Sequence, residues 1–185
     1  MARNVILDVD TGSDDACAIM LAALSEELNV LGVCAVNGNR PLSDTLTNTL
    51  KIIELLKMED KIPVVKGAAQ PLVRDLLSGR NKNPKTAEIQ LDENGEEICY
   101  HPKKFNLPEP VLKPVDENFV TWYINTIKNS PEKVTIVPVG PLTNIAIVLR
   151  AEPSLVDNIE EILSVMKPGR DILMFGKADY GQALG

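Results

Sequence analysis

Residues 5–24 read VILDVDTGSDDACAIMLAAL, and the rest of the chain can be interpreted outward from this stretch. It opens with Val5-Ile6-Leu7, a short apolar run of the kind found in buried strands of parallel sheets. Thr11-Gly12-Ser13 then supplies a turn, and from Asp14 the apolar residues recur at helical spacing. The stretch therefore predicts a strand, a turn and a helix, and such a junction is where α/β folds bind their ligands.

Four carboxylates crowd this junction: Asp8, Asp10, Asp14 and Asp15. Capping of the helix explains acids in its first turn, at about 0.5–2 kcal/mol each, but it does not explain Asp10. Strand alternation places Asp8 and Asp10 on the same side of the strand. Like charges this close raise each other's pKa unless a cation or a proton separates them. Because all the donors are oxygens, we expect calcium or magnesium and not zinc.

Two later turns also follow predicted strands. The strand predicted at 29–36 ends at Asn37-Gly38-Asn39, and the strand predicted at 133–139 ends at Gly140-Pro141. The carboxyl ends of parallel strands share one edge of the sheet, so Asn39 is expected near Asp10, although an ordinary turn residue is the alternative. A backbone carbonyl at the second turn could complete a calcium shell.

The alternation of strands and helices indicates an α/β fold, an open, mostly parallel, Rossmann-like sheet with helices on both faces. A single domain over 1–185 is expected, with an irregular loop insertion at 79–114 that is polar and rich in Pro, Asn and Gly. The predicted strands are 5–7, 29–36, 62–66, 133–139 and 162–166. The predicted helices are 14–24, 44–58 (capped by Ser43), 70–78, 115–129, 142–150 and 155–161, and a hairpin is possible around Asn94-Gly95.

Composition excludes several classes of protein. Nineteen basic against 26 acidic residues give a formal charge of −7, which argues against nucleic acid or an anionic membrane as partner. No apolar run approaches the roughly 18 residues of a membrane span. We expect no signal peptide, because the first predicted strand follows the N-terminus directly. Cys17, Cys34 and Cys99 form no C-x-x-C pair, so we expect Cys17 and Cys34 to be small buried residues and the compartment to be the cytoplasm.

The acidic stretch resembles a known family signature. Asp8-Val9-Asp10-Thr11-Gly12-Ser13-Asp14-Asp15-Ala16 is similar to the D-x-D-x-G-x-D-D-A opening of the inosine–uridine-preferring nucleoside hydrolases. The runs VNGN at 36–39 and VPVGPLTN at 137–144 fit the same family in the same order. The resemblance implies the nucleoside hydrolase fold, truncated at the C-terminus, because the family's chains are much longer and only the first half of their domain is matched.

The resemblance also implies an activity: calcium-dependent hydrolysis of the N-glycosidic bond of purine and pyrimidine ribonucleosides to free base and ribose. Asp10, Asp15 and the backbone carbonyl of Val139 would be the calcium ligands, with Asp10 also the base toward water. Asp14 and Asn39 would bind the ribose of the small-molecule substrate, and the protein would be a homo-oligomer, a dimer or a tetramer. The single histidine, His101, is interpreted as a loop residue, and Asp179 is not expected to be a metal ligand.

Two other functions remain open. A truncated, non-catalytic relative would keep the fold and calcium binding without hydrolysis. A haloacid-dehalogenase-type phosphatase would use Asp8 as nucleophile, Asp10 as acid and magnesium as cofactor, although that class expects a threonine or valine where this chain has Gly12. Release of ribose from a nucleoside would indicate the nucleoside hydrolase, whereas release of phosphate from a phosphoester would indicate the phosphatase.

Overall fold

The computed structural model describes residues 2–72 and 102–164, and these form a five-stranded parallel sheet. The strand order across the sheet is β3-β2-β1-β4-β5, so the first strand is central. The strands are β1 (Arg3–Val9), β2 (Leu28–Ala35), β3 (Val64–Lys66), β4 (Val134–Pro138) and β5 (Ile159–Ile162). The predicted open parallel sheet is therefore confirmed.

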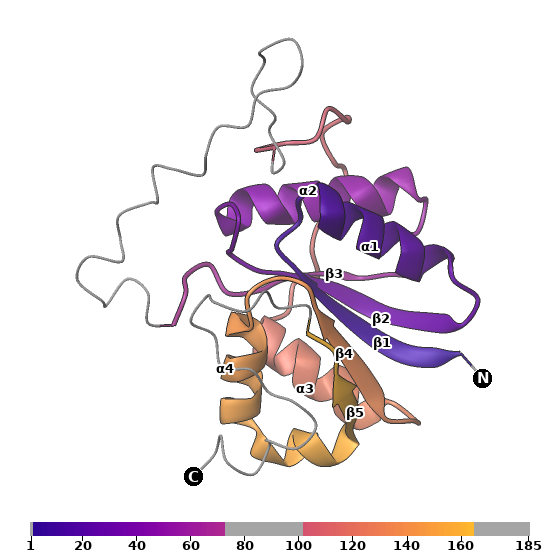
Figure 1. Ribbon diagram of the computed structural model, residues 1–185, viewed down its shortest axis with the longest axis vertical. Helices are drawn as coiled ribbons and strands as arrows, with labels where there is room; N and C mark the ends of the chain where they lie inside the picture. The colour runs from indigo at the N-terminus through magenta and orange to yellow at the C-terminus, as the bar shows by residue number, and fades with distance from the viewer. Residues whose placement is uncertain (1, 73–101, 165–185) are drawn as a thin grey trace.

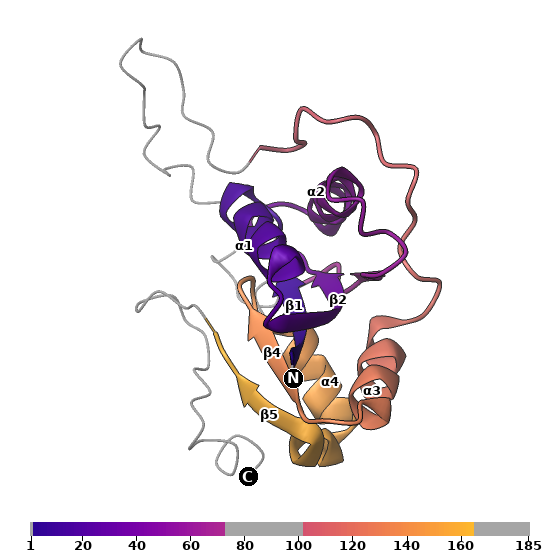
Figure 2. The same ribbon diagram turned by 90° about the vertical axis from the view of Figure 1, so that its right-hand side faces the viewer.

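Helices cover both faces of this sheet (Figure 1). The helices are α1 (Ser13–Leu24), α2 (Leu42–Leu55), α3 (Phe119–Asn129) and α4 (Thr143–Ala151), followed by a 3-10 helix at Pro153–Asn158. Helices α1 and α2 lie on one face, and α3 and α4 lie on the other, as the view along the edge of the sheet also shows (Figure 2). The predicted arrangement of helices on both faces is confirmed as well.

Side-chain alternation along β1 builds a core on each face. Val5, Leu7 and Val9 pack with α1 and α2, whereas Ile6 packs with α3 and α4. All four side chains are buried, and complete burial of such a residue contributes roughly 1.5–3 kcal/mol. A one-residue slip of β1 would exchange the two faces, so this alternation fixes its register.

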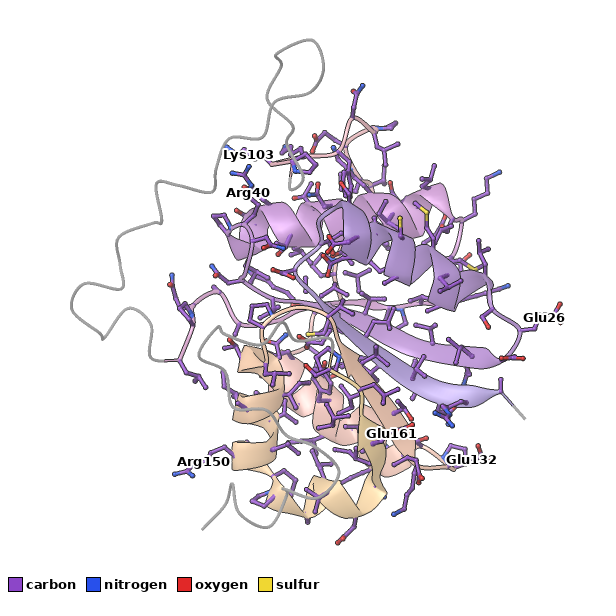
Figure 3. The ribbon with its side chains drawn as sticks, viewed as in Figure 1. Glu26, Arg40, Lys103, Glu132, Arg150 and Glu161 are labelled. Atoms are coloured by element: carbon purple, nitrogen blue, oxygen red, sulfur yellow. The ribbon has the colours of Figure 1, made fainter. Side chains whose placement is uncertain are left out.

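The pairing register brings the strand ends together at one edge of the sheet. Asp8 pairs with Cys34 of β2 on one side and with Pro138 of β4 on the other. The turns that follow β1, β2 and β4 therefore begin at the same level. In Figure 3, Arg40 lies at this carboxyl end, whereas Glu26 and Glu132 lie at the opposite end of the sheet.

Three local predictions are wrong. The helix predicted at 155–161 is a 3-10 turn only as far as Asn158, because Ile159 to Ile162 pair with β4 as strand β5. Ser43 does not cap α2, which begins at Leu42 after Pro41. Cys17 is exposed and not buried, since it lies on the outer side of α1, while Cys34 is buried as predicted.

Several other predictions fall outside the described residues. These are most of the helix at 70–78, the hairpin at Asn94-Gly95, Cys99, His101, the strand end at 165–166 and Asp179. The described part of the loop insertion, residues 102–114, contains no helix or strand. Among the described helices, none is both long and apolar enough to cross a membrane.

Candidate active site

Asp10 lies at the meeting point of the turns that follow β1, β2 and β4. The backbone N–H of Asn39 donates a hydrogen bond of 2.7 Å to its Oδ2 atom. A Cβ atom on Gly38 would overlap the carboxylate, and one on Gly140 would lie 2.8 Å from the Asp10 nitrogen. Asp10 is 5% exposed. The structure thus brings the predicted Asp10 and Asn39 together and packs the β4 turn against Asp10.

Asp15 lies in the first turn of α1 and is also buried. Its Oδ2 atom accepts a hydrogen bond of 3.0 Å from the Gly12 N–H, while its Oδ1 atom has no partner among the described residues. Burial raises the pKa of Asp15 from 3.8 to about 6, and the charges of Asp10 and Asp14 add to that rise. A buried carboxylate oxygen without a partner is what a bound cation would satisfy.

Asp8 lies beneath this turn and has no exposed surface. Its Oδ2 atom accepts hydrogen bonds from the Tyr123 hydroxyl at 2.7 Å and from the Asn144 side chain at 2.9 Å. Burial nevertheless raises the pKa of Asp8 to about 7, and the charge of Asp10 contributes in the same direction. Asp8 therefore lies beneath Asp10 and is fixed there by Tyr123 and Asn144.

Asn144, in the first turn of α4, joins the ends of several strands. Its Nδ2 atom lies 2.9 Å from Asp8 and 3.5 Å from the carbonyl oxygen of Ala35, at the ends of β1 and β2. Its Oδ1 atom accepts a hydrogen bond of 2.7 Å from the Ala68 N–H, beyond β3. Together with α4, this one side chain holds the carboxyl ends of β1, β2 and β3 in fixed positions.

The other predicted site residues have varied environments. Asp14 and Asn39 are exposed, as ligand-binding side chains can be. Val139 is half-buried, and its N–H donates a hydrogen bond of 2.9 Å to the Asp8 carbonyl, which places it directly beside β1. No local pattern marks Tyr123 as a site residue, because an aromatic side chain in the predicted helix at 115–129 is typical of a core position.

The donor set suits a hard cation in kind but is small in number. In residues 2–72 and 102–164 no group of three or more His, Cys, Asp or Glu side chains is placed to hold a metal ion. Oxygen donors would come from three residues: Asp10, Asp15 and, through its carbonyl, Val139. These are fewer than the six to eight ligands that calcium takes. Water, substrate or other residues would have to complete the shell.

A separate cavity of about 600 Å³ opens beside the carboxyl end of β3. It lies between residues 66–69 and 114–119, and none of the four aspartates of the β1–α1 junction lines it. Its wall includes Ala68, which binds Asn144. Since the carboxylates are what the chemistry requires, we assign the candidate site to the Asp10 turn and not to this cavity.

The sequence is similar to that of known nucleoside hydrolases. Residues 5–166 match the family model described as inosine-uridine preferring nucleoside hydrolase. The pyrimidine-specific ribonucleoside hydrolase RihA of Shewanella woodyi (strain ATCC 51908 / MS32) is 39% identical over 181 residues, which are 98% of this chain and 50% of that protein. The chain thus spans about half the length of the relatives it matches.

Solved structures show the same likeness. The plant nucleoside hydrolase PpNRh1 superposes with a TM-score of 0.68 at 30% identity, covering 89% of this chain and 48% of that one. The purine-preferring ribonucleoside hydrolase from Gardnerella vaginalis gives a TM-score of 0.67 at 26% identity, covering 88% of this chain and 48% of that one.

Proposed function

The chain belongs to the inosine-uridine preferring nucleoside hydrolase family, and on that premise we propose that it hydrolyses the N-glycosidic bond of ribonucleosides to free base and ribose. The observation that carries the proposal is the position of Asp10, held by the Asn39 N–H where three strand ends meet. Relatives named as pyrimidine-specific support pyrimidine ribonucleosides such as uridine as the first substrates to test.

Hydrolysis of such a bond passes through a sugar with oxocarbenium character, so the site must activate a water and hold the ribose. Asp10 would take the proton from the attacking water, because one of its oxygens is oriented by Asn39. The exposed Asp14 carboxylate and the Asn39 side chain would bind ribose hydroxyls. Asp8 would keep the strand beneath Asp10 in place through Tyr123 and Asn144.

Calcium is part of this proposal. Asp10, Asp15 and the Val139 carbonyl would hold the ion, and the unpartnered Oδ1 atom of Asp15 supports that assignment. When bound, calcium would lower the pKa of a coordinated water and stabilise developing charge. A cytoplasmic location and a homo-oligomeric state remain predictions from the sequence.

Two measurements on the same protein test the proposal. The first is a thermal melt with and without calcium, and the second is release of reducing sugar from uridine and from inosine. We expect calcium to raise the melting temperature of the unaltered chain, since a ligand that binds only the folded state stabilises it. Asp10→Asn should remove both the calcium effect and ribose release.

Asp60→Asn is the matched control, because Asp60 is an exposed acid in the turn after α2, at the other end of the sheet. It should keep both the calcium effect and the activity. A calcium effect without ribose release would instead support the non-catalytic alternative. If the unaltered chain shows no calcium effect and releases no ribose, the proposal is contradicted for this chain.

A further inference from the structure

Helix α2 buries several polar side chains. Asn48 and Thr49 have no exposed surface, and Lys51 is 3% exposed. Buried polar groups are expensive unless they are hydrogen-bonded, so each must have a structural or functional partner.

Asn48 binds two segments that are distant in sequence. Its Nδ2 atom donates to the carbonyl oxygens of Thr11 at 3.3 Å and of Pro102 at 3.4 Å. Its Oδ1 atom accepts a hydrogen bond of 3.1 Å from the Phe105 N–H. Thr11 is the residue after Asp10, whereas Pro102 and Phe105 belong to residues 102–112, which we call the arm and which pass outside α2 (Figure 2).

Within residues 2–72 and 102–164, the side-chain hydrogen bonds of Thr49 and of Lys51 each reach only one of these two segments. The Thr49 hydroxyl lies 2.7 Å from the Thr11 hydroxyl, and it also donates to the Thr45 carbonyl at 2.8 Å. Because a hydroxyl has one proton to donate, Thr11 is the donor to Thr49. Thr49 thus contacts the turn alone.

Among the described residues, the Lys51 side chain forms its hydrogen bonds with the arm and not with the turn. Its ammonium group donates to the carbonyl oxygens of Phe105 and Leu107 at 3.1 and 3.0 Å, and it lies 3.3 Å from the Glu109 carboxylate. Glu54 accepts a further hydrogen bond from the Leu112 N–H. Thr49 therefore bonds to the turn and Lys51 bonds to the arm, whereas Asn48 bonds to both.

We propose that Asn48 is a positioning residue that fixes the Thr11 carbonyl, and hence the turn carrying Asp10, and couples that turn to the arm. Its amide is fully buried, and its donor and acceptor atoms are divided between the two segments. Loss of the side chain would leave the Thr11 carbonyl and the Phe105 N–H without this partner, so both segments would open more often. The catalytic consequence rests on the proposed function, but the coupling itself does not.

Amide hydrogen exchange of the full chain tests the coupling without reference to activity. In Asn48→Ala we expect exchange about tenfold faster at the turn amides of Gly12 and Ala16 and at the arm amides of Phe105 and Leu107. Lys51→Met should accelerate only the arm amides, and Thr49→Val only the turn amides. The proposal would be overturned if the turn amides of Asn48→Ala exchange at the rate of the unaltered chain. It would also be overturned if Lys51→Met accelerates exchange of the turn amides equally.

Asn48→Asp serves where Asn48→Ala fails to fold, since it keeps the acceptor for Phe105 and removes the donor to Thr11. It should accelerate exchange at the turn while Phe105 stays protected, and the reverse pattern would refute the assignment. If ribose release is measurable, Asn48→Ala should lower kcat about tenfold with little change in KM, because a misplaced Asp10 affects the transition state. Lys51→Met should keep kcat within about twofold, and equal losses in both variants would indicate a merely structural role.

Discussion

The Tyr123 hydroxyl donates a hydrogen bond of 2.7 Å to the Oδ2 atom of Asp8, across 115 positions of sequence. Neither residue has exposed surface. The bond joins α3 to the central strand directly beneath the Asp10 turn, so the packing of a helix on one face of the sheet reaches the candidate site through a single polar contact. The buried Tyr123 and Asp8 side chains therefore help to position the candidate site.

Tyr123→Phe should lower the free energy of unfolding by roughly 1–3 kcal/mol, because it leaves the buried Asp8 carboxyl with one hydrogen bond fewer. Urea denaturation measures this difference. Phe119→Leu, an apolar change on the same helix, is the control and should destabilise by less than about 1.5 kcal/mol. A Tyr123→Phe effect that persists unchanged in an Asp8→Ala background, where no side-chain acceptor remains, would contradict a direct interaction.

Stability should fall between pH 4 and pH 7, and Asp8 should be the main cause. Burial raises the pKa of Asp8 from 3.8 to about 7, so over this interval the folded state keeps a proton that the unfolded chain has released. The free energy of unfolding then decreases with rising pH, by up to about 1.4 kcal/mol per pH unit, and levels off above pH 7.

Asp8→Asn should flatten that slope in calcium-free buffer, leaving the smaller contribution of Asp15, whose pKa burial raises to about 6. Denaturation curves recorded at several pH values measure both proteins. Equal slopes in the two proteins would show that Asp8 does not titrate in this range.

Gly38→Ala should remove the calcium effect on the melting temperature, because the added methyl group would overlap the Asp10 carboxylate. Gly32→Ala is a matched control, since its methyl group would meet the Trp122 ring at 2.5 Å and the three atoms nearest to it belong to Trp122 and Pro63. It should lower the melting temperature and keep the calcium effect. Retention of that effect in Gly38→Ala would argue against Asp10 as a ligand.

Asn144→Ala should destabilise the fold by about 2–4 kcal/mol, as it removes the partners of the Ala68 N–H and of Asp8 at once. Asn125→Ala is the control, because Asn125 is exposed and bonds only to Glu117 among its recorded side-chain partners. Its effect should be within about 0.5 kcal/mol. Chemical denaturation compares the two, and similar small losses would mean that Asn144 does not join the strand ends.

The order and type of the main elements could be predicted, because they depend on local patterns. The apolar run at Val5, the turn at Gly12 and the helical spacing after Asp14 all lie within one stretch of sequence. The proximity of Asn39 to Asp10 followed from the rule that parallel strands end at one edge. That proximity is present in the structure as a backbone hydrogen bond, with the Asn39 side chain left exposed.

The polar interior could not be predicted in the same way. The helical spacing of Leu46, Leu50 and Ile53 in α2 is typical of a core face. Asn48 and Lys51 lie beside that face and are buried too, because they contact an arm more than fifty positions away in sequence. The hydroxyl of Tyr123 has no local signal either, because its partner lies on another element. Such contacts depend on the tertiary arrangement, about which hydrophobic periodicity carries no information.

The pairing of β1 with β4 bears on how the chain reaches its fold. Val5 pairs with Thr135, and no described strand other than β2 and β4 pairs with β1. During synthesis β2 follows β1 soon and pairs with one of its edges, but the other edge of β1 stays unpaired until β4 is made, and an unpaired edge of an apolar strand is prone to aggregate. The acidic residues that directly follow it provide the charge that keeps such segments apart. Neutralising them should thus increase aggregation during refolding, whatever it does to catalysis, so that the same carboxylates act as gatekeepers before the site exists.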